Sequence, residues 1–451
     1  MRTCKNQAAL ILCLLLICSL LNPIKLAYAA DEQEGLTETL YVLLDKPKQI
    51  KKIDSILIKN QINVKKIQEI GFLQLKGNIG QLNSCLQDIS AAVDASWYKE
   101  PIESSEAKLF HNKISWDLHG IEELNEYLWY AESQTNNYET YKIQEGNPEV
   151  KIALLDSGVD LSNENFGQTI VTANSWNYVD GNNNVQDQNG HGTQVAGIMN
   201  LLAPEISIVP YKIMNNNGGN SFDLLSAVVQ ATNDKNQVIN ISAGSYIQLD
   251  EAGYILQEAY QRAIDYADKN QVIVVASAGN RGSNADYDNA SNEIHVPSML
   301  ENVISVGAVT KSNRLAPYSN YGPYIDYVAY GGYFGDNFDT AGEINVTDLM
   351  LTAFPGQLPN TPLDSILNIP QGYSLSYGTS LAAPQVSATA ALLISNYYDK
   401  HHKFPKSDKI LNLLEKSVVD LGDPGRDDQY GYGQILVNKA LVKKNTKTEG
   451  E

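Results

Sequence analysis

Residues 149–160 read EVKIALLDSGVD, a mostly apolar run that ends in Asp156 and a glycine-containing turn. A short apolar run closed by turn residues predicts a strand that is buried on both faces of a sheet. Strand-like apolar runs and segments of helical spacing alternate downstream, at 192–202, 206–213, 221–235, 237–244, 259–271, 272–280 and 303–309. This alternation predicts the α/β class, with a parallel sheet that carries helices on both faces.

Three stretches within this pattern each place a reactive side chain among small residues. They are LLDSGVD with Asp156, NGHGTQVAG with His191 and YGTSLAAP with Ser380. A serine hydroxyl needs a base to become a nucleophile, and a carboxylate can orient that base and stabilise its charged form. Taken singly, Asp156 and Ser380 could equally be caps and HGT an ordinary turn. Together, in the chain order Asp, His, Ser, they predict a nucleophilic triad.

The same three stretches resemble the signature blocks of the subtilisin-like serine proteases. Further similarity runs through VINISAG, VIVVASAGN and VPSMLENVISVGAV, so that the resemblance covers about residues 114–441. It implies a subtilisin-like parallel sheet flanked by helices, and serine endopeptidase activity. It also implies that Asn280, the last residue of VIVVASAGN, donates to the oxyanion of the transition state beside the backbone N–H of Ser380.

The resemblance also implies how substrate binds. In this family an extended peptide pairs with enzyme backbone on both sides. The two segments that match are those of Ser242, Ala243 and Gly244 and of Gly218 and Gly219.

Two residues of the primary specificity pocket are unusual. By resemblance, Arg281 borders this pocket and His295 lies at its floor. A cation at the rim and an imidazole at the floor favour a substrate with Glu or Asp immediately before the scissile bond, the P1 position. The alternative is that Arg281 faces solvent and His295 only fills a neutral pocket.

The first 29 residues differ from the rest of the chain. Arg2 and Lys5 precede the apolar run AALILCLLLICSLL, and LAYA offers signal peptidase a cleavage site after Ala29. This pattern predicts a secretory signal at 1–29. An uncleaved membrane anchor is the alternative, but the run is short of the about 20 residues that a span needs. A lipoprotein signal at Cys18 is a further alternative, although a bulky residue precedes it.

Residues 30–100 read as a small ferredoxin-like α+β unit of order β-α-β-β-α-β. By position and architecture this unit resembles the propeptides of the family, which assist folding and act as intramolecular inhibitors. A polar, acidic linker at 101–113 separates it from a catalytic unit at 114–442, and a polar tail follows at 443–451. An enzyme that cuts after Glu could process itself near this linker, although acidic linkers also serve solubility. The candidate self-cleavage sites are Glu100, Glu103 and Glu106.

Composition indicates where the protein acts and which kinds of partner it does not bind. The net charge of −19 becomes more negative once the cations of the signal are removed, which argues against binding to nucleic acid or to anionic membranes. Three of the four cysteines lie in the signal and only Cys85 remains, so the exported protein has no intramolecular disulfide. We expect a monomeric, extracellular bacterial protein that leaves the membrane after signal cleavage.

Two departures from the family pattern concern loops. Only NLLAPE separates GTQVAGIM from ISIVPYKI, where many secreted members carry a longer loop that holds a structural calcium. That calcium site is therefore expected to be missing, and no metal or cofactor is predicted. Residues 331–372 form an insertion before Ser380 that could shape the site.

These features together resemble the leader peptidases of lantibiotic gene clusters, which remove the leader from a modified precursor after export. The sequence thus predicts a secreted, self-processing serine endopeptidase that matures such a precursor. A general degradative extracellular protease is the alternative. A pseudoprotease that only binds peptides is more remote, because the triad and Asn280 are intact.

Overall fold

The structure, a computed structural model, describes residues 37–99, 122–284 and 292–442. The predicted signal and tail lie outside the described residues. The same is true of the three self-cleavage candidates, Glu100, Glu103 and Glu106.

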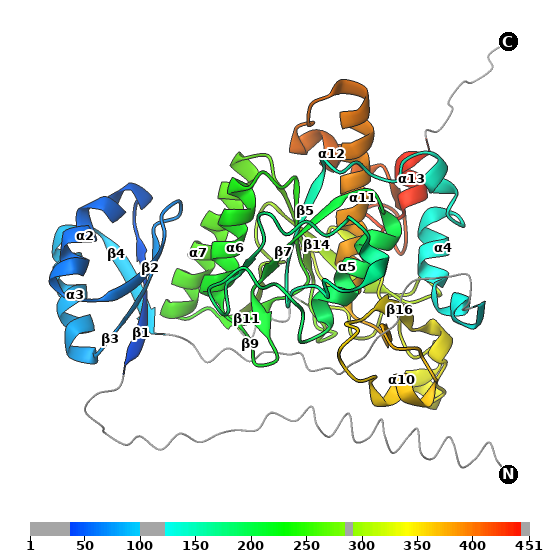
Figure 1. Cartoon of the computed structure of the whole chain (residues 1–451), viewed down its shortest axis with the longest axis horizontal. Helices are drawn as coiled ribbons and strands as arrows, with labels where there is room; N and C mark the ends of the chain where they lie inside the picture. Colours follow the sequence, from blue (N-terminus) through cyan, green and yellow to red (C-terminus); the bar gives the residue numbers. More distant parts are fainter. Residues whose placement is uncertain (1–36, 100–121, 285–291, 443–451) are drawn as a thin grey trace.

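A nine-stranded sheet forms the centre of the larger unit (Figure 1). Its strands in spatial order are β18 (Val418–Val419), β19 (Gln434–Ile435), β15 (Tyr327–Tyr330), β14 (Val303–Val309), β12 (Ile273–Ser277), β10 (Val238–Ile241), β5 (Lys151–Asp156), β7 (Ser207–Lys212) and β6 (Trp176–Asn177). Every neighbouring pair is parallel except β18 with β19. The predicted parallel α/β sheet is confirmed.

Helices cover both faces of this sheet. The longer ones are α5 (His191–Leu202), α6 (Ser221–Asn233), α7 (Glu251–Lys269), α11 (Thr379–His401) and α12 (Ser407–Glu415), and shorter ones are α4 (Trp129–Thr135), α9 (Phe338–Ala341), α10 (Pro362–Ile366) and α13 (Val437–Leu441). Within β5, Ile152 and Leu154 join the core that contains α5 and α11, whereas Ala153 and Leu155 join the core that contains α6 and α7. Both faces of the strand are therefore buried, which explains its continuous apolar sequence.

One helix is longer than its sequence pattern suggests. The spacing predicts a helix over 259–271, whereas α7 begins at Glu251. Asp250 caps this earlier start, since its side chain accepts a hydrogen bond from the backbone N–H of Gly253. The cap extends the helix by two turns over residues of weaker periodicity.

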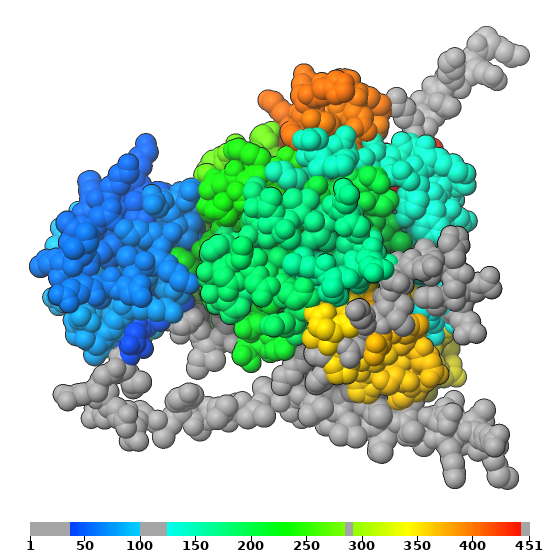
Figure 2. Space-filling view, in the orientation of Figure 1, coloured from blue at the N-terminus to red at the C-terminus, as the bar shows by residue number. Residues whose placement is uncertain are grey.

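The small unit has the predicted element order. It contains β1 (Glu38–Leu44), α2 (Ile50–Lys59), β2 (Asn63–Ile67), β3 (Phe72–Gly77), α3 (Ile79–Ala92) and β4 (Ala95–Lys99), with antiparallel strands in the order β2-β3-β1-β4. The helices cover one face of its sheet, and the other face packs on α6 and α7 (Figures 1 and 2).

Aromatic side chains fill the contact between the two units. Tyr41 and Phe72 of the small unit lie with their ring centroids 6.3 and 5.6 Å from that of Phe222 on α6. Arg262 of α7 adds a hydrogen bond of 2.6 Å from Nη1 to the carbonyl of Leu44. Lys65 Nζ of β2 also lies 3.8 Å from Asp223 Oδ1 of α6. The small unit is therefore fixed to the two helices by apolar burial and by two charged donors.

A hairpin that the sequence did not predict begins within the insertion at 331–372 and ends just after it. Its strands are β16 (Met350–Ala353) and β17 (Tyr373–Ser376), and β16 packs on α5. From α4, Trp129 Nε1 donates to the carbonyl of Leu349 at 3.0 Å, and the Tyr130 hydroxyl donates to that of Leu351 at 2.9 Å. The hairpin is thus held between α4 and the helix that begins at His191. The remaining strands are β8 (Met214–Asn215), β9 (Gly218–Gly219), β11 (Ser245–Gln248) and β13 (Glu293–Val296).

Candidate active site

Asp156 and His191 meet at the carboxyl end of the sheet. Asp156 is the fully buried last residue of β5, and His191 is the first residue of α5. A distance of 2.8 Å separates His191 Nδ1 from Asp156 Oδ1. This approach requires glycine at position 192, because a Cβ there would lie 2.1 Å from the carbonyl oxygen of Gly158. With Nδ1 engaged, Nε2 is the ring nitrogen that can exchange a proton with another group.

Burial and charge act in opposite directions on His191. Burial disfavours the imidazolium, whereas the Asp156 carboxylate, its hydrogen bond to the ring and the charge of Asp187 all favour it. The charges prevail, and the pKa of His191 lies above its ordinary value. The surroundings thus stabilise the protonated ring that would form when a serine gives up its proton.

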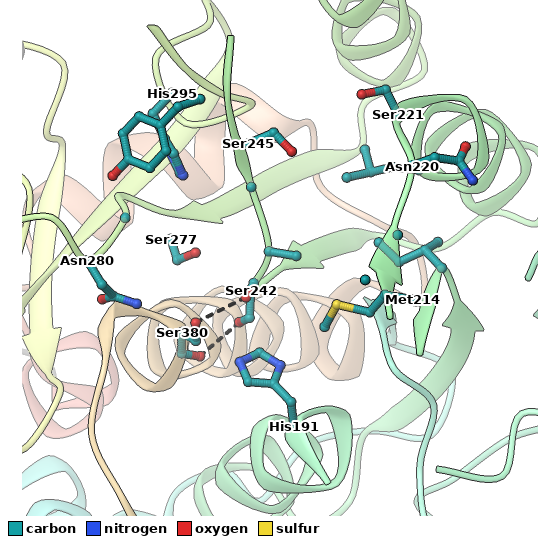
Figure 3. A pocket seen from close by; sticks show the side chains of 18 of the residues that line it. His191, Met214, Asn220, Ser221, Ser242, Ser245, Ser277, Asn280, His295 and Ser380 are labelled. Atoms are coloured by element: carbon teal, nitrogen blue, oxygen red, sulfur yellow. Dashed lines mark hydrogen bonds between the residues drawn. The ribbon is translucent and has the colours of Figure 1, made fainter. Parts of the chain in front are cut away.

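Ser380, the second residue of α11, exchanges hydrogen bonds with Ser242. The Ser242 hydroxyl donates to the Ser380 carbonyl at 2.8 Å, and the Ser380 hydroxyl donates to the Ser242 carbonyl at 3.1 Å. The Ser380 carbonyl is available because Pro384, four residues on, has no N–H to donate within the helix. Figure 3 shows the His191 imidazole beside these two serines. Proton transfer to His191 therefore requires the Ser380 hydroxyl to leave the Ser242 carbonyl.

Thr379 orients the side chain of Asn280. Asn280 Oδ1 accepts from both the backbone N–H and the hydroxyl of Thr379, each at 2.9 Å. Its amide nitrogen points into the cavity that also contains Ser380 (Figure 3). This role of Thr379 is not apparent from the sequence, where a threonine at the start of a helix reads as a cap.

Two backbone segments line the same cavity as His191, Asn280 and Ser380. One is the segment Ser242–Gly244 at the end of β10, and the other is β9 with Gly218 and Gly219. The structure therefore brings all the residues predicted for peptide pairing to one cavity. An extended peptide between these segments would place a carbonyl near Ser380.

Arg281 is held by two neighbours that the sequence analysis missed. Its guanidinium carbon lies 3.3 Å from the centroid of the Tyr246 ring, and its Nη1 lies 2.8 Å from Glu293 Oε2. The expected cation does line the cavity, but a carboxylate already compensates part of its charge. Residues two apart on a strand share a face, so Glu293 lies on the same side of β13 as His295, and pairing with β11 places Tyr246 opposite His295. This pairing is not evident from the sequence.

His295 lies deep in the same part of the cavity. Its side chain packs on Tyr246 with ring centroids 4.6 Å apart, and its Nδ1 lies 2.7 Å from Ser298 Oγ. Burial and the charge of Arg281 lower the pKa of His295 to about 3. The ring is therefore neutral near pH 7 and offers a hydrogen bond, not a second positive charge. The ring also lies directly against the Ser242–Gly244 segment, since a Cβ on Gly244 would lie 2.5 Å from it.

The loop between α5 and β7 is short, consisting of residues 203–206. Within 37–99, 122–284 and 292–442, no group of three or more His, Cys, Asp or Glu side chains could hold a metal ion. Over the same residues, no helix has the length and apolar character needed to cross a bilayer.

Comparison with known proteins agrees with the fold. The sequence profile of the subtilase family matches residues 147–433. The crystal structure of a lanthipeptide protease is 49% identical, with a TM-score of 0.70 over 74% of this chain and 99% of the other.

Proteins of lantibiotic maturation recur among the relatives. The epidermin leader peptide-processing serine protease EpiP of Staphylococcus epidermidis is 26% identical, over 86% of this chain and 90% of its own length. The crystal structure of EpiP from Staphylococcus aureus is also 26% identical, with a TM-score of 0.72 over 91% of this chain and 99% of the other. The chain therefore belongs to the subtilase family of serine proteases.

Proposed function

We propose that this protein is a secreted serine endopeptidase that removes the leader from an exported, lantibiotic-type precursor peptide. The observation that carries the proposal is the 2.8 Å contact between Asp156 and His191, beside Ser380 in a cavity that also contains the Asn280 amide. The leader-processing role is supported by the names of relatives that resemble this chain over most of its length.

In the proposed reaction, Ser380 Oγ attacks the scissile carbonyl carbon while its proton passes to His191 Nε2. Asp156 stabilises the imidazolium, which then gives the proton to the leaving amine as the C–N bond breaks and an acyl-serine remains. Water attacks this ester with His191 again taking a proton, and the proton returned to Ser380 Oγ releases the acid.

The negative oxygen that forms during each attack would lie between two donors. One is the Asn280 amide, held by Thr379, and the other is the backbone N–H of Ser380 in the first turn of α11. The positive end of the helix dipole also favours a negative charge there. The hydrogen bonds from Thr379 fix the orientation of the Asn280 amide, and preorganised donors of this kind give strong electrostatic stabilisation of a transition state.

An acidic P1 residue is the specificity that these residues support best. The contact of Arg281 with Glu293 uses Nη1, while a guanidinium has five N–H donors. Other N–H groups of Arg281 can therefore bind a substrate carboxylate, with the neutral ring of His295 as a hydrogen-bond partner. An enzyme with this preference could process itself after Glu100, Glu103 or Glu106.

We further propose that the small unit is the inhibitory and folding-assisting propeptide of a monomeric zymogen, preceded by a signal peptide at 1–29. The unit packs on α6 and α7, and α6 begins two residues after the Gly218–Gly219 segment that lines the cavity. Its attachment beside the cavity is suited to an inhibitor whose chain continues from Lys99 into the processing linker.

Two measurements test the proposed function. A fluorophosphonate probe should label the wild-type protein and not Ser380→Ala, and an unlabelled wild-type protein would refute the enzymatic roles. A panel of peptides and casein should show cleavage restricted to sites after Glu or Asp. Broad digestion of casein without this preference would instead indicate a degradative protease.

A further inference from the structure

Asp187 is a buried carboxylate that the triad does not include. It lies four residues before His191, and its side chain is inaccessible to solvent. The residues around it belong to the two segments that carry Asp156 and His191. Asp187 therefore lies where it can act on both Asp156 and His191.

Every close contact of the Asp187 carboxylate is with a donor. Oδ1 accepts from the backbone N–H groups of Asn189 and Gly190, at 2.9 and 3.0 Å, and from the Ser157 hydroxyl at 3.0 Å. Oδ2 accepts from the backbone N–H and the hydroxyl of Thr193, at 3.0 and 2.6 Å. Burial raises the pKa of Asp187, whereas the three backbone N–H groups among its five donors cannot accept a proton and favour the ionised carboxylate.

These contacts link residues next to Asp156 with residues next to His191. Asn189, Gly190 and Thr193 surround His191 in the chain, whereas Ser157 directly follows Asp156. The Ser157 hydroxyl that donates to Asp187 also accepts from the backbone N–H at position 192, at 2.9 Å. Through one carboxylate the end of β5 is therefore tied to the start of α5.

The unforeseen hairpin supports this arrangement from outside. Gln357 Nε2 donates to the backbone carbonyl of Asp187 at 3.0 Å. The backbone N–H of Gly356 donates to Asp160 Oδ2 at 2.7 Å, and Asp160 in turn donates its N–H to Thr193 Oγ1 at 3.0 Å. The chain is thus held both before His191, at Asp187, and after it, at Thr193.

We propose that Asp187 is a positioning residue that sets the geometry of the Asp156–His191 pair and adds a negative charge beside it. The inference rests on the proposed roles of Asp156 and His191. Asp187 acts through the backbone and through Ser157, and it touches neither substrate nor reacting atoms.

Several charged groups face this region and set the background for any pH effect. Asp156 contacts the ring of His191, and Asp160 lies on the far side of Thr193. The buried Lys212 donates to the carbonyl of Gln186, close enough for its charge to interact with that of Asp187. Replacement of Asp187 by a neutral side chain leaves these three charges in place, so the change in pH dependence reports on Asp187 itself.

The substitution Asp187→Asn tests the proposal. An amide keeps the shape but turns one oxygen into a donor that faces other donors, so the loop should shift. We expect kcat on a peptide substrate to fall by about 10²-fold, the effect of a misplacement of about 1 Å, with KM within about twofold. Because a favourable negative charge is lost, the acidic limb of the kcat/KM profile should move to lower pH, and the His191 pKa measured by NMR in a Ser380→Ala background should fall.

Milder variants keep the test valid if Asp187→Asn does not fold. Ser157→Ala and Thr193→Val each remove a hydroxyl that donates to Asp187 and should lower kcat without a change in KM. Their controls are Ser395→Ala and Thr389→Val, buried residues of α11 whose hydroxyls bond only to backbone carbonyls of that helix. Thermal unfolding of all four shows how much of any effect is general destabilisation.

The outcomes are distinguishable. Variants at 157 and 193 that match their controls in kcat and in the pH profile would overturn the positioning role, as would an Asp187→Asn enzyme with wild-type kinetics. If the wild-type protein does not cleave peptides, or if His191→Ala still does, the proposed function on which the inference rests is overturned instead.

Discussion

Arg281 and His295 show how neighbouring side chains decide what a pocket residue can offer. Arg281 lies flat on Tyr246 and contacts Glu293, so its direction is fixed and its charge is partly compensated. His295 is buried beside that charge and remains neutral. Any preference for an acidic P1 residue must therefore depend mainly on Arg281.

The substitution Arg281→Gln should reduce kcat/KM for a peptide with Glu at P1 by roughly ten- to a hundredfold, and should affect the matching Gln peptide much less. The reason is the loss of a charged hydrogen bond, which contributes about 1.5–3 kcal/mol. Arg426→Gln is the matched control, since Arg426 also lies over a tyrosine and contacts an aspartate. Equal losses for the two peptides would remove Arg281 from P1 recognition.

The pH dependence of cleavage should follow His191 and not His295. His191 must be neutral to accept a proton, and its pKa is raised, so kcat/KM should fall as the pH drops through a value above about 6.5. His295 loses its charge near pH 3 and should add no limb in the working range. A pH–rate profile of His295→Gln that lacks a limb present in the wild-type enzyme would contradict this assignment.

At the scale of elements, the start of α11 depends on a hydrogen bond that Pro384 cannot make. A proline at this position leaves the Ser380 carbonyl without a helical partner, and Ser242 takes that place. The strand β10 and the helix α11 are thereby joined next to the Ser380 hydroxyl. Pro384 lies beyond the first turn of α11, where a missing N–H does not stabilise a helix. Its effect is to leave the Ser380 carbonyl free for the Ser242 hydroxyl.

We expect Pro384→Ala to lower kcat/KM severalfold without lowering the melting temperature. The new N–H competes with the Ser242 hydroxyl for the Ser380 carbonyl, while the helix itself gains from alanine. Activity assays and thermal unfolding check this expectation, with Pro362→Ala at the first residue of α10 as the control. Unchanged activity in Pro384→Ala would show that the Ser242 contact is not needed.

The elements that could be predicted from sequence are those with strong local patterns. The buried strands β5, β7 and β10 have continuous apolar sequences, and α6 has clear helical spacing. The hairpin β16–β17 was missed because its strands, MLTA and YSLS, are short, contain polar residues and are separated by residues 354–372. The partners of Arg281 could not be foreseen, because they depend on the register in which β11 pairs with β13. Asp187 was missed because its role depends on a loop that folds back on itself.

At the scale of the whole molecule, the two units are joined by one face of the small sheet. The contact combines aromatic packing around Phe222 with the hydrogen bond from Arg262 to the carbonyl of Leu44. Apolar burial gives such a contact most of its strength, and the partly buried guanidinium of Arg262 fixes the orientation of the two units through a directional hydrogen bond. The strength of this contact sets how long the small unit would remain after the linker is cut.

Arg262→Ala should speed the release of the small unit from the processed protein by roughly ten- to a hundredfold. Its side chain bonds the small unit directly, and a charged hydrogen bond contributes about 1.5–3 kcal/mol. Lys269→Ala on the same helix is the control, because Lys269 is exposed and its ion pair is with Asp265 of α7. Gel filtration after processing measures the release, and identical rates for the two variants would refute the importance of this bond.

The exchange of hydrogen bonds between Ser242 and Ser380 has a consequence for the timing of reactivity. The Ser380 hydroxyl donates its proton to a carbonyl that cannot accept it fully, so the serine is poorly activated in this arrangement. A peptide that pairs with the Ser242–Gly244 segment would disturb this arrangement as it binds, and would turn the hydroxyl toward His191. We therefore expect a peptidyl phosphonate to inactivate the enzyme much faster than a small sulfonyl fluoride of equal intrinsic reactivity. Such an enzyme would be protected from adventitious acylation until a strand-shaped substrate arrives.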